Sequence, residues 1–143
     1  MTTLAYLDTN ALVKLYLPEE GGQQVIDLLD EVDGVVTSVL SYPETLSVFA
    51  RALDRGLITE ERYDLARQEF EEDWTMALRI EMVEAVYRRA GSLMKHQPKL
   101  RTLDALHLSS ALEARQHYDL QFLTFDKALR AAAIAILGQA AVV

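Results

Sequence analysis

The sequence predicts an α/β protein with a short, mostly parallel central sheet of four or five strands flanked by about seven helices. Short apolar runs recur along the 143 residues, and between them the apolar residues repeat with the period of a helix. Alternation of this kind is typical of βαβ units, in which helices cover parallel strands. Half of the residues are hydrophobic, which suffices for one ordinary core. We therefore expect a single domain over residues 1–143.

Five segments are candidates for the strands. The first apolar run is Leu4–Leu7, and the second, Val35–Val39, is rich in β-branched residues. A weaker run lies near Leu78–Val83, and a fourth covers Leu120–Phe125. The last residues, Ala140–Val143, are a candidate for a short edge strand.

Helical periodicity fills the intervals between these runs. Four stripes have apolar or aromatic residues at helical spacing: Val25-Leu28-Leu29-Val32, Leu46-Phe49-Ala50-Leu53, Tyr63-Ala66-Phe70-Trp74 and Val83-Val86-Tyr87-Ala90. The two middle stripes, between Glu44 and Ala77 with a break near Gly56, predict a helical hairpin inserted between strands. The segment Thr102–Arg115 is apolar over a wider arc and predicts a more buried helix. A last helix is expected over Asp126–Leu137, just before Gly138.

Composition excludes several classes of protein. The chain has no cysteine, so a disulfide framework, a thiolate metal site and a thiol nucleophile are all excluded. Its 14 basic and 22 acidic residues give a net charge of −8, so it lacks the overall basic surface of many nucleic-acid binders. No apolar stretch approaches the length of a membrane span or a secretory signal. We therefore expect a cytoplasmic protein without a membrane partner.

Four acids stand at predicted element boundaries. Asp8 ends the first strand, Glu44 opens the helix after the second, Asp104 lies in the first turn of the buried helix, and Asp126 follows the fourth strand. In a parallel sheet, the ends of strands and the starts of the following helices share the edge where ligands bind. We therefore expect these four carboxylates to meet at one rim.

Each of these acids also has a purely structural explanation. Asp8 and Asp126 are suitable helix N-caps, and Ser41 with Glu44 has the spacing of a capping box. Asp104 suits the positive end of a helix dipole. Only the expected convergence of all four favours a functional site.

Four neighbouring carboxylates repel one another unless cations neutralise them. Oxygen ligands without cysteine favour Mg²⁺ or Mn²⁺ over zinc. Two such ions about 3.5–4 Å apart make a site that cleaves phosphodiesters with an activated water. The motifs of serine hydrolases, phosphate-binding loops and zinc proteases are absent. His107, one turn after Asp104, is expected to be a structural or supporting residue near the site.

Four segments in order resemble those of PIN-domain proteins: L-D-T-N-A-L-V-K-L-Y, S-Y-P-E, R-T-L-D-A-L-H-L and L-T-F-D-K-A-L. Chain length and motif order are similar to the VapC-type toxins of toxin–antitoxin pairs. The resemblance covers essentially the whole chain. It implies a PIN fold and a ribonuclease that depends on Mg²⁺ or Mn²⁺.

The same resemblance implies roles for particular residues and partners. It maps the metal-binding, catalytic acids onto Asp8, Glu44, Asp104 and Asp126, and supporting residues onto Asn10 and Thr124. It also implies a homodimer and a cognate VapB-type antitoxin, which places a basic side chain in the acidic pocket. Operator DNA would be contacted only through the antitoxin.

An acidic protein needs local basic residues to hold RNA. Lys14, Lys99 and Arg101 are our candidates for phosphate contacts, with Lys95, His96 and Lys127 also near the acids in sequence. Ordinary solvated charge is the alternative explanation. Three large aromatic residues of the predicted hairpin suit either a core or an interface with a partner: Phe49, Phe70 and Trp74.

Two other functions remain open at this point. One is a phosphatase that uses Asp8 as a covalent nucleophile, although such enzymes usually carry a second Asp where this chain has Asn10. The other is a PIN module that binds partners or RNA without catalysis. The complete set of four acids favours the nuclease over both.

Overall fold

A four-stranded parallel sheet forms the centre of the computed structural model, which describes residues 1–143. The strands lie in the order β3-β2-β1-β4, with bounds β1 Thr3–Leu7, β2 Gly34–Ser38, β3 Leu78–Ile80 and β4 Asp119–Leu123. In register, Tyr6 of β1 pairs with Val36 of β2 and with Phe122 of β4. The four predicted strands are therefore confirmed, with ends that differ by up to three residues.

The predicted edge strand at Ala140–Val143 is wrong. A short 3₁₀ turn, η1, covers Gln139–Ala141, and only a single parallel bridge joins Val142 to Phe122. The turn follows Gly138, whose φ of 96° is a left-handed conformation that glycine adopts without strain. The chain therefore meets the sheet edge at one residue rather than along a strand.

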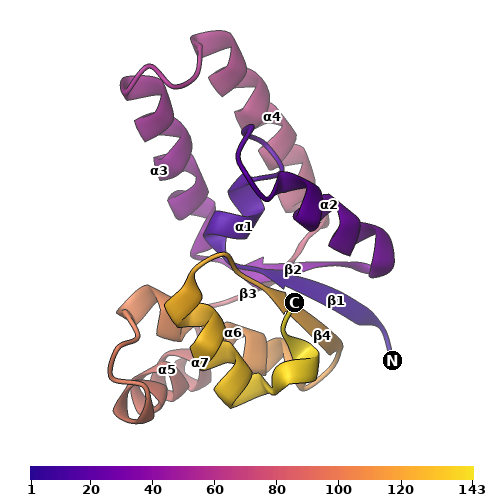
Figure 1. Ribbon diagram of the computed structural model, residues 1–143, viewed down its shortest axis with the longest axis vertical. Coiled ribbons are helices and arrows are strands. Elements are labelled where there is room, and N and C mark those ends of the chain that lie inside the picture. The colour runs from indigo at the N-terminus through magenta and orange to yellow at the C-terminus, as the bar shows by residue number, and fades with distance from the viewer.

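Seven α-helices cover both faces of this sheet, as predicted (Figure 1). Their bounds are α1 Thr9–Val13, α2 Gly22–Glu31, α3 Ser41–Asp54, α4 Glu60–Met76, α5 Glu84–His96, α6 Thr102–Arg115 and α7 Lys127–Leu137. Helices α1–α4 lie on one side of the sheet and α5–α7 on the other. None of the helices is both long and apolar enough to cross a membrane.

Strand β1 is apolar from Leu4 to Leu7, and both of its faces are covered. Ala5 and Leu7 belong to a core cluster shared with α1–α4, whereas Leu4 and Tyr6 belong to a second cluster shared with α6 and α7. Successive side chains of a strand point to opposite faces, so one short segment contributes to two cores. Helix α6 has seven buried residues, which confirms the prediction of a more buried helix.

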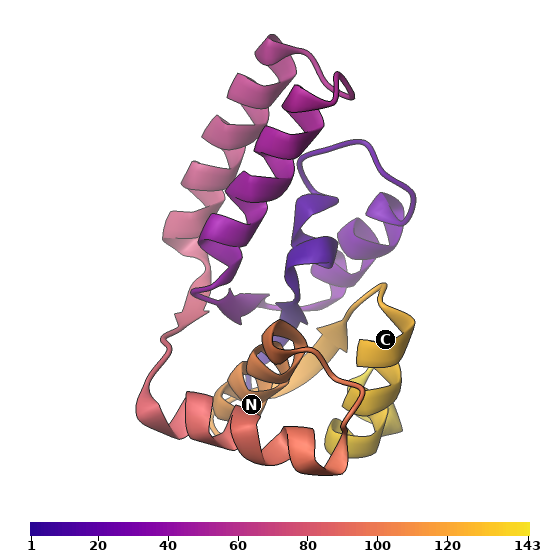
Figure 2. The ribbon, with the colours of Figure 1, turned by 90° about the vertical axis from the view of Figure 1, so that its left-hand side faces the viewer.

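Helices α3 and α4 form the predicted hairpin, which extends away from the sheet (Figure 2). Phe49 and Phe70 are fully buried between them, with ring centroids 6.1 Å apart. Trp74 is partly exposed, and its ring lies 5.5 Å from that of Phe70. Phe49 and Phe70 are therefore core residues, and Trp74 covers the edge of that core.

Replacing Phe70 by alanine is expected to lower the free energy of unfolding by about 3–5 kcal/mol, because it leaves a cavity between the two helices. The matched control is Leu65→Ala on the same helix, where the side chain is 45% exposed. That control is expected to cost about 0.5 kcal/mol or less. Urea denaturation measures both values, and equal losses would contradict the core assignment of Phe70.

Candidate active site

The ends of the parallel strands bring the four candidate acids to one edge of the sheet, which faces the viewer in Figure 2. Asp8 directly follows β1 and caps α1, and Asp126 caps α7. Glu44 and Asp104 lie in the first turns of α3 and α6. The expected convergence is therefore present in the structure.

A cavity of about 690 Å³ lies at this edge, between α3 and the start of α6. The side chains that give it polarity are Asp8, Asn10, Glu44, Arg51, Arg101, Asp104, His107 and Asp126. A smaller and more apolar cavity of about 360 Å³ lies near α1, β2 and α4 and contains none of the four acids. The chemistry that the sequence predicts is therefore confined to the larger, polar cavity.

Asp8 is almost completely buried and makes two hydrogen bonds. Its Oδ1 accepts the backbone N–H of Ala11 at 3.0 Å, and its Oδ2 accepts the Thr124 hydroxyl. Thr124 in turn accepts the backbone N–H of Asp126 at 3.2 Å, and Asp126 Oδ1 accepts the N–H of Leu129 at 2.8 Å. Asp8 and Asp126 are thus helix caps and cavity residues at once. The structural and the functional explanation of these two acids are therefore compatible.

The capping box that the spacing of Ser41 and Glu44 suggests does not form. The N-cap of α3 is Leu40, and no side chain caps that helix end. Ser41 Oγ lies 2.8 Å from the Thr37 hydroxyl and 3.2 Å from the Thr9 hydroxyl instead. Glu44 is therefore released from a structural role at the helix end.

Glu44 uses one oxygen within the protein. Its Oε1 accepts the Thr9 hydroxyl at 2.9 Å and His107 Nε2 at 3.1 Å. Burial alone would raise the pKa of Glu44, but the hydrogen bonds from His107 and Thr9 favour the charged form and lower it. Glu44 is therefore held as a carboxylate with Oε2 free of protein hydrogen bonds.

The remaining acids destabilise one another's charges. Burial raises the pKa of Asp8, and the charge of Asp126 raises it further. The pKa of Asp104 is raised by burial and then by the charges of Asp126 and Asp8. Asp104 makes no hydrogen bond or ion pair with the protein. The four acids of the cavity outnumber its two arginines, Arg51 and Arg101, so negative charge dominates there.

The donor set fits a hard divalent cation. No three of these side chains already converge as a ligand cage, but Asp104 and one oxygen each of Glu44 and Asp126 are free to take a ligand. Both nitrogens of His107 are engaged, one by Tyr6 and one by Glu44. An all-oxygen set with no free nitrogen or sulfur suits Mg²⁺ or Mn²⁺ better than zinc.

Lys14 lies outside the cavity lining. Its Nζ is 3.5 Å from a Glu19 carboxylate oxygen and 4.7 Å from the centre of the Phe125 ring. Although Lys14 is close to Asp8 in sequence, it is the C-cap of α1, and its side chain meets Glu19 in the following loop. It is thus engaged in holding that loop.

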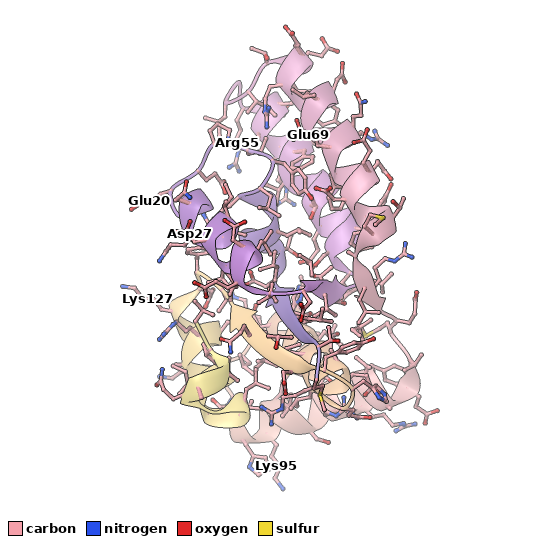
Figure 3. All side chains as sticks on the ribbon, turned by 90° about the vertical axis from the view of Figure 1, so that its right-hand side faces the viewer. Glu20, Asp27, Arg55, Glu69, Lys95 and Lys127 are labelled. Carbon is pink, nitrogen blue, oxygen red and sulfur yellow. The ribbon has the colours of Figure 1, made fainter.

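Of the other basic residues singled out from the sequence, only Arg101 lines the cavity. Lys99 does not, and Lys95 projects from the end of the molecule opposite the hairpin, whereas Lys127 begins α7 (Figure 3). The sequence reasoning missed Arg51, which lines the cavity on the same helix as Glu44. The seven-residue spacing of Glu44 and Arg51 in the sequence could have indicated this, because it places both on one face of the helix.

Comparison with known proteins places this sequence in a family. The sequence profile of the PIN domain matches residues 5–135. The chain belongs to the PIN-domain family. This confirms the resemblance of its four sequence segments.

Two curated relatives of this PIN-domain chain come from Mycobacterium tuberculosis: Ribonuclease VapC45 of strain CDC 1551 / Oshkosh and Ribonuclease VapC49 of strain ATCC 25618 / H37Rv. Each is 35% identical over 109 residues, which cover 76% of this chain and 75% of the relative. The chain is therefore a VapC-type member of the family.

Two solved structures share the fold of this PIN domain. A toxin–antitoxin complex from Klebsiella pneumoniae has a chain with a TM-score of 0.63 and 19% identity, covering 97% of this chain and 95% of that one. FitAcB from Neisseria gonorrhoeae has a TM-score of 0.64 and 20% identity, covering 90% of this chain and 92% of that one. At these identities the likeness supports the fold alone.

The charge of Asp104 is expected to destabilise the folded protein when no metal is present. Its pKa is raised in the folded state, so the fold binds the proton more tightly than the unfolded chain does. Stability is then lost as the pH rises through the ordinary aspartate range near 3.9 toward the raised value. In EDTA, Asp104→Asn should therefore melt at a higher temperature than wild type at pH 7, and the gain should vanish at low pH.

The control is Asp64→Asn, which removes one charge from the exposed side of α4. Differential scanning calorimetry from pH 3 to pH 8 measures both variants. If the two substitutions raise the melting temperature at pH 7 equally, net charge rather than repulsion in the cavity is the cause.

Proposed function

We propose that this chain is a metal-dependent endoribonuclease that acts as the toxin of a type II toxin–antitoxin pair, and that one PIN domain over residues 1–143 carries the activity. The observation that carries the proposal is the convergence of Asp8, Glu44, Asp104 and Asp126 on one cavity. The ribonuclease names of the two relatives at 35% identity support the same reaction.

We assign metal binding and catalysis to the four acids, with Mg²⁺ (or Mn²⁺) as the cofactor. Bound divalent ions would activate a water and stabilise the leaving oxygen of the phosphodiester. Thr124 fixes Asp8 and the backbone of Asp126 in place, and Asn10 is exposed at the cavity, where its amide can bind substrate or water. No side-chain nucleophile is required.

A cognate VapB-type antitoxin is the proposed inhibitor. The solved structure from Klebsiella is described as a toxin–antitoxin complex, and a cavity of negative charge attracts a basic side chain. We also propose a homodimer, and contact with operator DNA only through the antitoxin. These proposals concern the assembly and leave the assignment of the acids unchanged.

The phosphatase alternative has less support. Such enzymes usually carry a second Asp where this chain has Asn10, and the two relatives at 35% identity are named ribonucleases. A binding module without catalysis would not need four acids in one cavity, whose mutual repulsion costs stability.

Asp8→Asn and Asp104→Asn are expected to lower the rate of Mn²⁺-dependent RNA cleavage at least about a hundredfold, because each removes a ligand charge worth several kcal/mol in the transition state. Asparagine remains a good N-cap, so the first substitution should leave α1 intact. The measurement is the single-turnover cleavage rate of the purified chain, with circular dichroism to check the fold. Folded variants that cleave RNA at the wild-type rate would contradict the site assignment.

Arg51 and Arg101 are expected to contact RNA phosphates, because both line the cavity and neither makes an ion pair within the protein. In an Asp104→Asn background that binds without cutting, alanine at either position should weaken RNA binding. The slope of log affinity against log salt concentration should fall by about 0.7 for each lost contact to single-stranded RNA.

Arg55 supplies the matched control, since it follows α3 by one residue and lies along the hairpin, outside the cavity lining (Figure 3). Arg55→Ala should leave both the affinity and the salt slope unchanged. Fluorescence anisotropy with a labelled oligonucleotide measures them. Equal weakening by all three substitutions would mean that only overall charge matters.

A further inference from the structure

A buried histidine behind the cavity links the centre of the sheet to Glu44. His107 is 3% exposed, its Nδ1 lies 2.8 Å from the Tyr6 hydroxyl, and its Nε2 lies 3.1 Å from Glu44 Oε1. Tyr6 is completely buried in the middle of β1. A continuous hydrogen-bonded path therefore runs from the core to the cavity.

The hydrogen bond between His107 and Glu44 has only one possible direction. An ionised carboxylate only accepts hydrogen bonds, so His107 Nε2 must carry a hydrogen and donate it to Glu44. In the neutral imidazole, Nδ1 is then an acceptor, and the Tyr6 hydroxyl supplies its hydrogen. The Tyr6–His107 pair thus selects the tautomer that can hold Glu44.

The rings are also locked in position. The Tyr6 ring stacks on Phe122 with centroids 5.2 Å apart, and it meets the His107 ring edge-on at 5.9 Å. These rings occupy the centre of the sheet and the buried face of α6. Rotation of His107 away from Glu44 would leave buried polar atoms without partners, which is costly.

We propose that His107, oriented by Tyr6, is a positioning residue that fixes the Glu44 carboxylate so that Oε2 faces the cavity. This inference rests on the proposed function, in which Glu44 helps to bind the metal ions. A histidine that served the core alone would not donate its hydrogen to a carboxylate of the cavity. Outer hydrogen-bond partners of this kind typically change metal affinity about 10–100-fold when removed.

Thr9 supplies the second hydrogen-bond donor to Glu44 Oε1 and links Glu44 to Asp8. Its hydroxyl donates to Glu44 Oε1 at 2.9 Å, and Thr9 follows Asp8 directly in the chain. With His107 on one side and Thr9 on the other, Oε1 is fully engaged. The geometry therefore leaves only Oε2 for ligands from the cavity.

Three substitutions test the proposal in the full chain. His107→Leu removes the donor to Glu44, His107→Gln keeps an N–H near the position of Nε2, and Tyr6→Phe removes only the hydroxyl that orients the ring. The matched control is Thr45→Val, because Thr45 is fully buried next to Glu44 and its hydroxyl has no hydrogen-bond partner. Mn²⁺ affinity is measured by the electron paramagnetic resonance signal of free Mn²⁺, and kcat and KM are measured for RNA cleavage.

His107→Leu is expected to weaken Mn²⁺ binding about 10–100-fold and to lower kcat with little change in KM for RNA. Tyr6→Phe should weaken Mn²⁺ binding about threefold to tenfold, because it removes one neutral hydrogen bond. His107→Gln should recover most of the loss, and Thr45→Val should match wild type. Wild-type Mn²⁺ affinity in His107→Leu would overturn the proposal. So would an equal loss of affinity in His107→Gln and His107→Leu. An equal loss in the control Thr45→Val and in His107→Leu would overturn it as well.

The same measurements separate this inference from the proposed function. A wild-type chain that binds Mn²⁺ but cleaves no RNA would overturn the nuclease assignment, while the Mn²⁺ affinities of the variants still decide the role of His107. A wild-type chain that binds no Mn²⁺ would overturn both.

Discussion

The crowding of carboxylates at the ends of the parallel strands is the constraint on which the rest of this structure depends. Burial and the charge of Asp126 disfavour ionisation of both Asp8 and Asp104. The fold offsets part of this cost with helix N-termini, whose amides bond Asp8 and Asp126 and whose dipoles favour negative charge. Parallel topology is what brings these helix starts to one edge, so the architecture and the charge of the cavity have a common cause.

The individual acids differ in how they are held. Asp8 and Glu44 are fixed by hydroxyl, amide and imidazole donors, whereas Asp104 has no partner in the protein. Fixed carboxylates provide a site whose geometry need not reorganise when a cation arrives, which favours binding and catalysis. The unpartnered Asp104 retains its full capacity to accept a ligand. Asp8 and Glu44 are thus held rigidly by the protein, whereas Asp104 of the same cavity is free to accept a ligand.

The sequence predicted the four strands, the helical hairpin and the position of all four acids, because periodicity marks the boundaries at which those acids stand. It did not predict the role of Tyr6, since a tyrosine in an apolar run gives no sign of which partner its hydroxyl will find. Ser41 and Glu44 matched a capping box, yet Ser41 instead contacts the hydroxyls of Thr37 and Thr9, and the contact with Thr9 exists only in the tertiary fold. Lys14 lies outside the cavity lining for a related reason: closeness to Asp8 in sequence does not fix the direction of a side chain at the end of a short helix.

The net charge of −8 at first argued against a nucleic-acid partner, and its distribution reverses that conclusion. Four of the acids line one cavity whose charge divalent ions would offset, and Arg51 and Arg101 stand at the same cavity. In the proposed function RNA would need only these local cations, while the rest of the acidic surface would discourage unspecific binding. Because the four acids outnumber the two arginines, the cavity attracts further positive charge. Under the proposed function, metal ions and a basic side chain of the antitoxin would compete for the same carboxylates. The feature that would enable catalysis would then also make the site open to inhibition.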